Sequence, residues 1–171
     1  MEQENLVQIL PKKGILVASL SIGDINAAYE VRLLVEPYAI QNYAKNIEKE
    51  WFENYKKILL EKEKEVREER DNRHELYEID DQFHMHFIKV MKNNYFVELY
   101  EQIYNQNLRL RILAASKGKK RMLNTQTEHL EVVELCLKEE WEAAANKMRE
   151  HLIFSKKASF EAIFQNGDML L

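Results

Sequence analysis

From residue 21 onward, apolar side chains recur every three or four positions, which is the period of an amphipathic α-helix. The pattern predicts a first helix behind the capping box Ser21-Ile22-Gly23-Asp24. Pro37 is expected to kink this helix or to start the next one, because its ring lacks an amide donor and clashes with the preceding turn. A further helix carries Trp51, Tyr55 and Leu59 on one face.

This second helix runs into a highly charged segment, in which eleven of the thirteen residues between positions 61 and 73 are charged. We expect a solvated helical arm or loop there. Opposite charges stand four residues apart, as in Glu63 with Arg67 and Lys64 with Glu68, a spacing that allows ion pairs along a helix.

Four more helices follow in the pattern. They are expected at about residues 75–91, 95–115, from Thr125 onward and 140–164. Gly118 is expected to cap the end of the second of these, and Thr125-x-x-Glu128 to form a capping box at the start of the third. The short connections favour antiparallel neighbours. The fold class predicted is all-α, an antiparallel bundle of six or seven helices.

The first twenty residues differ from the rest. Two short β-prone runs flank Pro11-Lys12-Lys13-Gly14, which has the chemistry of a hairpin turn. A lone two-stranded hairpin is marginal in water. We therefore interpret residues 1–20 as the remnant of another domain and residues 21–171 as the helical domain proper.

Composition narrows the class of protein. Four glycines and two prolines are far too few for a turn-rich β-protein. The net charge of −4 argues against a chain that holds nucleic acid by bulk electrostatics. Cys136, the single cysteine, excludes disulfides within the chain and a thiolate-rich zinc site, and fits a reducing compartment. With no long apolar run and no signal-peptide pattern, we expect a cytoplasmic protein.

The five histidines are the most informative polar residues. In the helix expected at 75–91, Asp80 and His84 stand one turn apart on the apolar face. A buried carboxylate is costly unless it is paired or binds a metal. His86 lies about 200° around the helix and is expected to face solvent. His74 and the basic run 117–121 are expected to lie in exposed loops.

His129 and His151 form a second pair, because each lies eleven residues from Glu140. If the chain reverses there, each histidine stands about 16 Å from the turn, at the same height on adjacent helices. These two side chains could converge with Asp80 and His84 as ligands for zinc, nickel or another divalent first-row ion. The alternative is that the histidines are hydrogen-bonded core residues and that Asp80 pairs with an arginine.

These residues resemble a known family, the FCD effector domain of FadR-type GntR transcription regulators. The resemblance rests on several motifs: Asp80-Asp81-Gln82-Phe83-His84 with Asn93, Glu128-His129, Ala144-x-x-x-Met148-Arg149-x-His151, Arg32-Leu-Leu-Val-Glu36-Pro37, and a wing-like strand at Pro11–Val17. Two positions depart from the family pattern. Glu139-Glu140 replaces the usual Gly-Asp of the last interhelical turn, and Val35 stands where leucine is common.

The resemblance implies a role as well as a fold. In this family the helical domain binds a small organic acid, often through a metal, and controls a winged helix-turn-helix domain that precedes it. By this resemblance the chain is a non-enzymatic sensor that forms a homodimer and reaches operator DNA only through a domain it lacks. The metal ligands implied are Asp80, His84, His129 and His151.

For the effector, Arg32 offers a planar guanidinium that matches a carboxylate, although an ion pair with Glu36 explains it equally well. Thr125 offers a hydroxyl, although an N-cap role explains it too, and Arg109 is a weaker candidate, as is Arg111. We expect a cavity lined by Phe83, Phe87 and Met148.

Two other functions stay open at this point. A metal-dependent hydrolase could use the same ligands to activate water, but it needs a general base. Glu128 adjoins His129 yet points about 100° away on a helix. The third possibility is a helical interaction module in which the histidines are ordinary core residues.

Overall fold

The computed structural model describes residues 7–10, 14–17, 22–69, 73–103 and 118–166. Strands β1 (Val7–Leu10) and β2 (Gly14–Val17) pair antiparallel, with Val7 opposite Val17 and Leu10 opposite Gly14. The hairpin expected near the N-terminus is therefore formed. The expected cap at Ser21, the turn 11–13 and the end of the helix predicted at 95–115 lie outside the described residues.

Everything else that is described is helical or connects helices, which confirms the all-α prediction. A 3₁₀ turn (Ala44–Asn46) follows the first helix, and residues 94–103 are also helical. The principal helices are α1 (Ile22–Tyr43), α2 (Lys49–Arg67), α3 (Arg73–Val90), α5 (Lys119–Leu137) and α6 (Trp141–Asn166).

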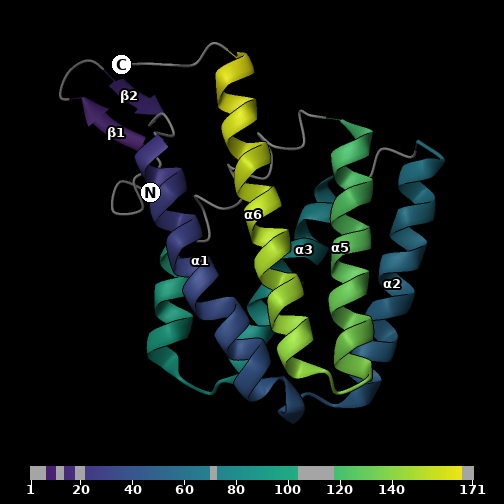
Figure 1. Ribbon diagram of the computed structural model, residues 1–171. Coiled ribbons are helices and arrows are strands. Elements are labelled where there is room, and N and C mark those ends of the chain that lie inside the picture. The colour runs from purple at the N-terminus through teal and green to yellow at the C-terminus, as the bar shows by residue number, and fades with distance from the viewer. Residues whose placement is uncertain (1–6, 11–13, 18–21, 70–72, 104–117, 167–171) are drawn as a thin grey trace.

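Four of these helices lie side by side in the order α1, α6, α5, α2, and α3 lies behind them (Figure 1). The pairs α1 with α6, α6 with α5 and α5 with α2 are in contact along this layer, while α3 packs against α1. Because α3 backs the middle of the layer, its buried face can meet side chains from α5 and α6.

The predicted apolar face of α3 is confirmed. All six of its members, the last of which directly follows the helix, are buried, with exposed fractions of 7% or less: Leu76, Asp80, Phe83, His84, Phe87 and Met91. Below His129 on α5, Val132, Val133 and Cys136 are buried, and Ala144, Met148 and Leu152 are buried around His151 on α6. The histidines therefore belong to the centre of one continuous core.

Pro37 does not start a new helix. α1 continues through it for another six residues, and Glu36, Ala39 and Ile40 beside it are completely buried. Packing of this segment outweighs the missing backbone hydrogen bond, as tertiary contacts commonly outweigh local propensity.

The start of α5 was also wrongly predicted. The helix begins at Lys119, and Gly118, with φ of 84°, is its N-terminal cap. Whether Gly118 also ends the helix predicted at 95–115 depends on residues outside the described ones. Thr125 lies inside α5, where its hydroxyl donates to the carbonyl of Arg121 at 3.1 Å. A threonine inside a helix bonds four residues back in this way, so the Thr125-x-x-Glu128 pattern has an explanation other than capping.

The charged segment is partly built into the bundle. Both predicted ion pairs form, at 2.5 Å for Arg67 with Glu63 and 4.0 Å for Lys64 with Glu68. However, Lys62 is buried between Glu65 and Glu75, and so the segment is not a freely solvated arm over its whole length.

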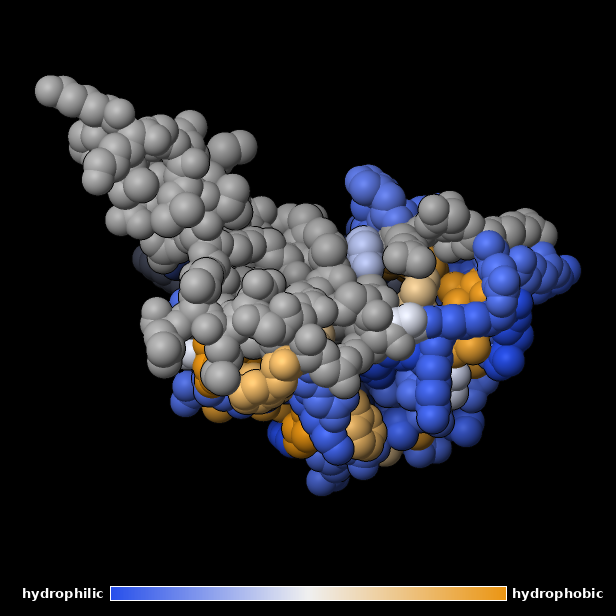
Figure 2. All heavy atoms as spheres, turned by 90° about the horizontal axis from the view of Figure 1, so that it is seen from above, coloured by the Kyte–Doolittle hydropathy of each residue, from blue (hydrophilic) through white to orange (hydrophobic). Residues whose placement is uncertain are grey.

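Hydrophilic residues make up most of the described surface seen from above, and hydrophobic residues appear there as small separate groups (Figure 2). Among the helices of the described ranges, none combines the length and the apolar character that a membrane span requires.

Candidate metal centre

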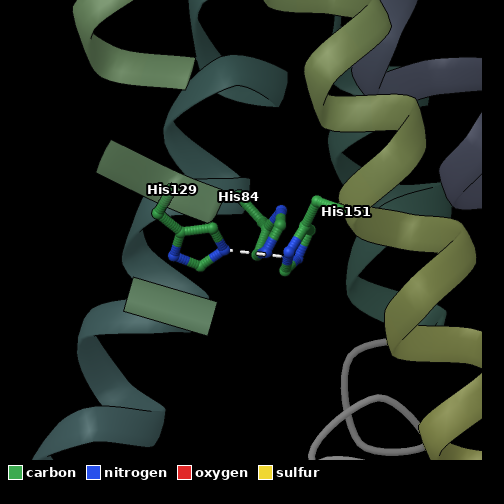
Figure 3. Close-up of side chains that lie close together, drawn as sticks. All are labelled: His84, His129 and His151. Atoms are coloured by element: carbon green, nitrogen blue, oxygen red, sulfur yellow. Dashed lines mark hydrogen bonds between the residues drawn. The ribbon is translucent and has the colours of Figure 1, made fainter. Parts of the chain in front are cut away.

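Three histidines from three helices meet in the core. His84 comes from α3, His129 from α5 and His151 from α6, and each offers a ring nitrogen within 4.8 Å of the other two (Figure 3). The Nε2 atoms of His129 and His151 are 3.2 Å apart. Each residue is at most 2% exposed. The turn at residues 138–140 therefore places the two histidines at equal height, as their spacing predicted.

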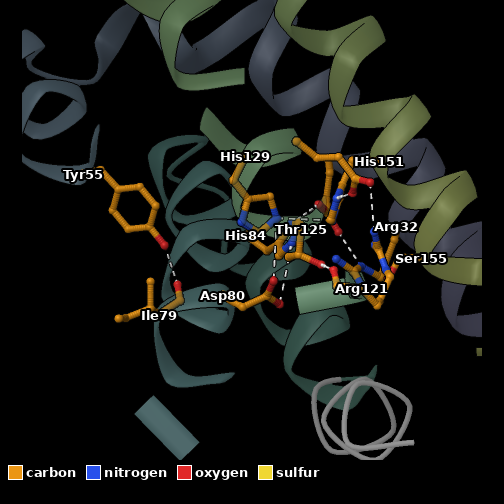
Figure 4. Close-up of polar contacts among 12 residues, drawn as sticks. Arg32, Tyr55, Ile79, Asp80, His84, Arg121, Thr125, His129, His151 and Ser155 are labelled. Carbon is orange, nitrogen blue, oxygen red and sulfur yellow. Dashed lines mark hydrogen bonds and ion pairs between the residues drawn. The ribbon is translucent and has the colours of Figure 1, made fainter. Parts of the chain in front are cut away.

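Asp80 lies against the same group (Figure 4). Its Oδ2 is 3.8 Å from Nε2 of His84, and its Oδ1 is 3.6 Å from Nε2 of His129. The carboxylate thus faces two of the three rings. The four residues proposed from the sequence are all brought together.

Glu36 holds the far side of the His84 ring. Its Oε2 lies 2.5 Å from Nδ1 of His84, while its Oε1 accepts hydrogen bonds from Nε of Arg32 at 2.6 Å and from the hydroxyl of Tyr100 at 2.7 Å. Burial opposes ionisation of Glu36, but the charge of Arg32 and the contact with His84 outweigh it and hold its pKa well below the ordinary value. An ionised carboxylate only accepts, so Nδ1 of His84 is the donor.

Glu128 holds the far side of the His151 ring in the same way. Its Oε2 lies 2.6 Å from Nδ1 of His151, and its Oε1 accepts a hydrogen bond from Nη1 of Arg121 at 2.8 Å. The site thus contains two parallel chains of contacts, Arg32–Glu36–His84 and Arg121–Glu128–His151. Each runs from an arginine through a carboxylate, completely buried in Glu36 and part-buried in Glu128, to a ring of the histidine cluster.

These contacts show which nitrogen faces the centre in two of the rings. Because Nδ1 of His84 and of His151 lies on a carboxylate, Nε2 of each of these rings points to the centre. Nε2 of His84 has no hydrogen-bond partner among the described residues, although it is buried. Histidines that bind metals are held in this manner, with the second nitrogen on a carboxylate.

Burial also favours the neutral form of two of the three rings. It lowers the pKa of His129 and of His151 well below the ordinary value of 6.5, and the neighbouring histidines add to this effect. Neutral imidazoles are the form that coordinates a cation. Three imidazoles with one carboxylate form a donor set that fits zinc or a similar divalent ion.

A small cavity of about 60 Å³ adjoins the cluster. Two arginines, Arg32 and Arg121, line it together with the polar side chains of Asp80, Thr125, Gln126, His151 and Ser155. The expected lining of Phe83, Phe87 and Met148 is wrong. These three side chains are completely buried in the core, where the rings of Phe83 and Phe87 pack edge to face at 5.2 Å.

The predicted effector residues have different outcomes. Arg32 lines the cavity and also forms the ion pair with Glu36, so both interpretations of this residue hold geometrically. Thr125 lines the cavity as well. Arg109 and Arg111 lie outside the described residues.

His86 stands apart from the centre, as expected, but it does not simply face solvent. Its ring stacks on Trp51, with centroids 3.9 Å apart and planes 5° from parallel, and this half-buried position lowers its pKa.

Sequence reasoning missed Glu36 and Glu128 as partners of the histidines, and Arg121 as a lining residue. Glu128 does point away from His129 on its own helix, but that direction brings it to His151 on α6. Arg121 was assigned to an exposed loop because the start of α5 was placed six residues too late.

Comparison with known proteins agrees with this geometry. The family model of the FCD domain matches residues 27–154. An HTH-type transcriptional regulator from the TAR-I ttuE-ttuC' intergenic region of Agrobacterium vitis is 43% identical over 44 residues, which are 26% of this chain and 26% of that protein. The whole of that regulator is therefore not represented in the match.

Solved structures show the same fold. The metal-free FCD domain of TM0439, a candidate transcriptional regulator, aligns with a TM-score of 0.73 at 22% identity, covering 86% of this chain and 99% of that one. Its Zn²⁺-bound form aligns over the same shares at a TM-score of 0.65. A GntR-family regulator from Pseudomonas syringae pv. tomato aligns at 0.67 with 19% identity, covering 96% of this chain and 67% of that one. With the family model matching three quarters of its length, the chain belongs to the FCD domain family.

Proposed function

We propose that this chain is the ligand-sensing domain of a GntR/FadR-type transcription regulator, acting as a dimer in the cytoplasm. It would bind a divalent metal and a small organic acid, and the acid would control DNA binding by a winged helix-turn-helix domain. The observation that carries the proposal is the convergence of His84, His129 and His151 beside a cavity that contains two arginines.

The metal would be held by Asp80, His84, His129 and His151, with zinc or nickel as the best fit to three imidazoles and a carboxylate. Support comes from the unpartnered Nε2 of His84 and from the carboxylates behind two of the rings. One of the similar FCD structures contains Zn²⁺, which supports the same assignment. When bound, such an ion would supply positive charge and coordination positions for an anion.

The acid would enter the adjoining cavity. A site lined by the buried Arg32 and the part-buried Arg121 favours an anion, because charge interactions strengthen where bulk water is partly excluded. Arg32 already uses its Nε on Glu36, yet its Nη2 has no partner among the described residues. That nitrogen is the natural donor to an incoming carboxylate.

The hydrolase alternative is less well supported. Two carboxylates unnoticed in the sequence do lie at the site, but Glu36 and Glu128 contact Nδ1 of His84 and of His151, on the side of each ring away from Nε2. A general base must reach a water at the centre itself. The contacts of both glutamates, with an arginine and with an outer ring nitrogen, suit a positioning role instead.

The proposal is tested by elemental analysis of protein purified without a metal-affinity tag, followed by calorimetric titration of hydroxy acids, dicarboxylic acids and sugar acids. We expect binding to the metal-loaded protein and little binding after the metal is stripped. Arg32→Ala should weaken binding at least several-fold, and His86→Ala, which lies outside the cavity, should not. Equal binding to stripped protein, or an unaffected Arg32→Ala variant, would contradict the proposal.

A further inference from the structure

Gln126 is a buried polar side chain without an assigned role. It lies on α5 in the wall of the cavity beside the histidines and is 4% exposed. Its Oε1 has no hydrogen-bond partner among the described residues. Since a buried carbonyl without a partner is costly, its place in a cavity wall points to a partner that enters the cavity.

The rest of the wall shows what kind of partner is missing. The hydroxyl of Thr125 donates to the carbonyl of Arg121, and the hydroxyl of Ser155 accepts from Tyr29 at 2.9 Å. Nη1 of Arg121 donates to Glu128. The donor left for the carboxylate of an acid is Nη2 of Arg32, whereas the Gln126 carbonyl would repel a carboxylate and needs a donor.

We propose that Gln126 is a specificity-determining residue that accepts a hydrogen bond from a hydroxyl group of the effector. This inference rests on the proposed function and narrows its ligand from small acids in general to hydroxy acids. Arg32 and Gln126 line the same cavity. One ligand molecule would therefore supply both the hydroxyl that donates to Gln126 and the carboxylate that meets Arg32. A site built to pair a hydroxyl rejects the analogue that lacks it, since the carbonyl is then left without a partner.

The size of the cavity also favours a small hydroxy acid. Its volume of about 60 Å³ holds on the order of four to six water-sized groups. That space suits a compact acid in which the hydroxyl lies close to the carboxylate. A single hydroxyl is then a large share of the polar contacts that the ligand can make.

The test compares two acids that differ by one hydroxyl, lactate and propionate, titrated calorimetrically into the Zn²⁺-loaded chain. The wild type should bind lactate roughly ten-fold more tightly than propionate. Gln126→Met, which keeps the length of the side chain but removes its carbonyl, should bring this ratio to within about three-fold by weakening lactate alone. Gln41→Met, on the exposed surface of α1 and outside the cavity lining, should leave the ratio unchanged.

Unchanged propionate affinity in Gln126→Met shows that the variant is folded and loaded with metal. A wild-type ratio near one would overturn the inference while leaving the proposed function standing. A ten-fold ratio that persists in Gln126→Met would overturn it as well, because the hydroxyl would then be recognised by the metal. If the Zn²⁺-loaded wild type binds neither lactate, propionate nor any other small acid, the proposed function is contradicted. The inference about Gln126 then fails with it.

Discussion

At the scale of single residues, the orientation of two histidine rings depends on the glutamates that contact their Nδ1 atoms. His84 and His151 are oriented by Glu36 and Glu128, and each glutamate is in turn held by an arginine. Such carboxylates fix the tautomer and the angle of a metal-binding imidazole. In the proposed metal centre the two glutamates would therefore position the rings rather than bind the ion.

Removing the charge behind a ring should weaken metal binding. Glu128→Gln is expected to lower Zn²⁺ affinity about 10- to 100-fold, because the amide can present a donor to Nδ1 of His151 and disfavour the productive tautomer. Competition with a chromophoric chelator measures the affinity. Glu131→Gln, on the same helix and paired with Lys147 at the surface, is the control and should bind as wild type does. Equal affinity in Glu128→Gln would show that the glutamate does not act through the ring.

The metal-free protein should lose stability as the pH falls below about 6.5. His129 and His151 have folded-state pKa values well below 6.5, so the unfolded chain takes up protons that the folded chain does not. Their contribution is complete above pH 6.5 and is lost as the pH falls toward the folded-state values, with a slope of up to about 2.7 kcal/mol per pH unit for the two groups. Urea denaturation of chelated protein at several pH values between 7.5 and 5.5 measures the slope. A slope that is the same in His129→Ala would contradict this assignment.

At the scale of helices and turns, much of the structure could be predicted from periodicity. The face of α3 that carries Asp80 and His84 follows from a repeat of three and four, and the equal height of His129 and His151 follows from their distance to one turn. Local patterns failed where packing decided the outcome. α5 starts before its apparent capping box, and of the two expectations for Pro37, a kink or the start of a new helix, the second is wrong.

The roles of Glu36, Glu128 and Gln126 could not be predicted, because each depends on a contact with another helix or on a cavity. Sequence spacing gives the direction of a side chain around its own helix but not the neighbour that it meets. Arg32 shows the same limit, since its pairing with Glu36 follows from the spacing while its place in the cavity wall does not.

The turn between α5 and α6 has a residue in a conformation that favours glycine. Glu139 has φ of 61°, and the amides of Glu139 and Glu140 donate to the carbonyls of Cys136 and Leu135, in a Schellman pattern. Glu139→Gly should therefore stabilise the chain by roughly 0.5–1 kcal/mol, since it removes the strain of a left-handed side chain. Urea denaturation of metal-free protein measures the change. Glu140→Gly, at a position without positive φ, is expected to destabilise, and a destabilised Glu139→Gly would contradict the argument.

At the scale of the whole molecule, the histidine cluster joins helices that are distant along the chain. The proposed ligands come from α3, α5 and α6, and Glu36 adds α1, the helix that follows the N-terminal hairpin. A metal bound here would hold the layer of helices against α3. In the proposed regulator, α1 is the element through which a change at the centre could reach a preceding domain.

Metal should therefore stabilise the whole fold. Binding to the folded chain alone adds about 2.7 kcal/mol when the free ion is at 100 times its dissociation constant, which corresponds to roughly 5–11 °C in melting temperature. Calorimetric melting of metal-loaded protein before and after chelation measures the shift. His151→Ala should abolish most of it, whereas His86→Ala should retain it. Identical melting of loaded and chelated wild type would contradict a site that links three helices.

The central claim is that the histidine cluster is a metal centre, and a calorimetric titration of Zn²⁺ into metal-free protein tests it most directly. The account predicts one ion per chain for the wild type. Affinity should fall at least about 100-fold in His84→Ala, His129→Ala and His151→Ala, which each remove a ligand, and should be unchanged in His74→Ala, whose exposed ring lies outside the cluster. Stoichiometric binding that survives loss of any one of the three buried histidines, or no binding by the wild type, would contradict the account.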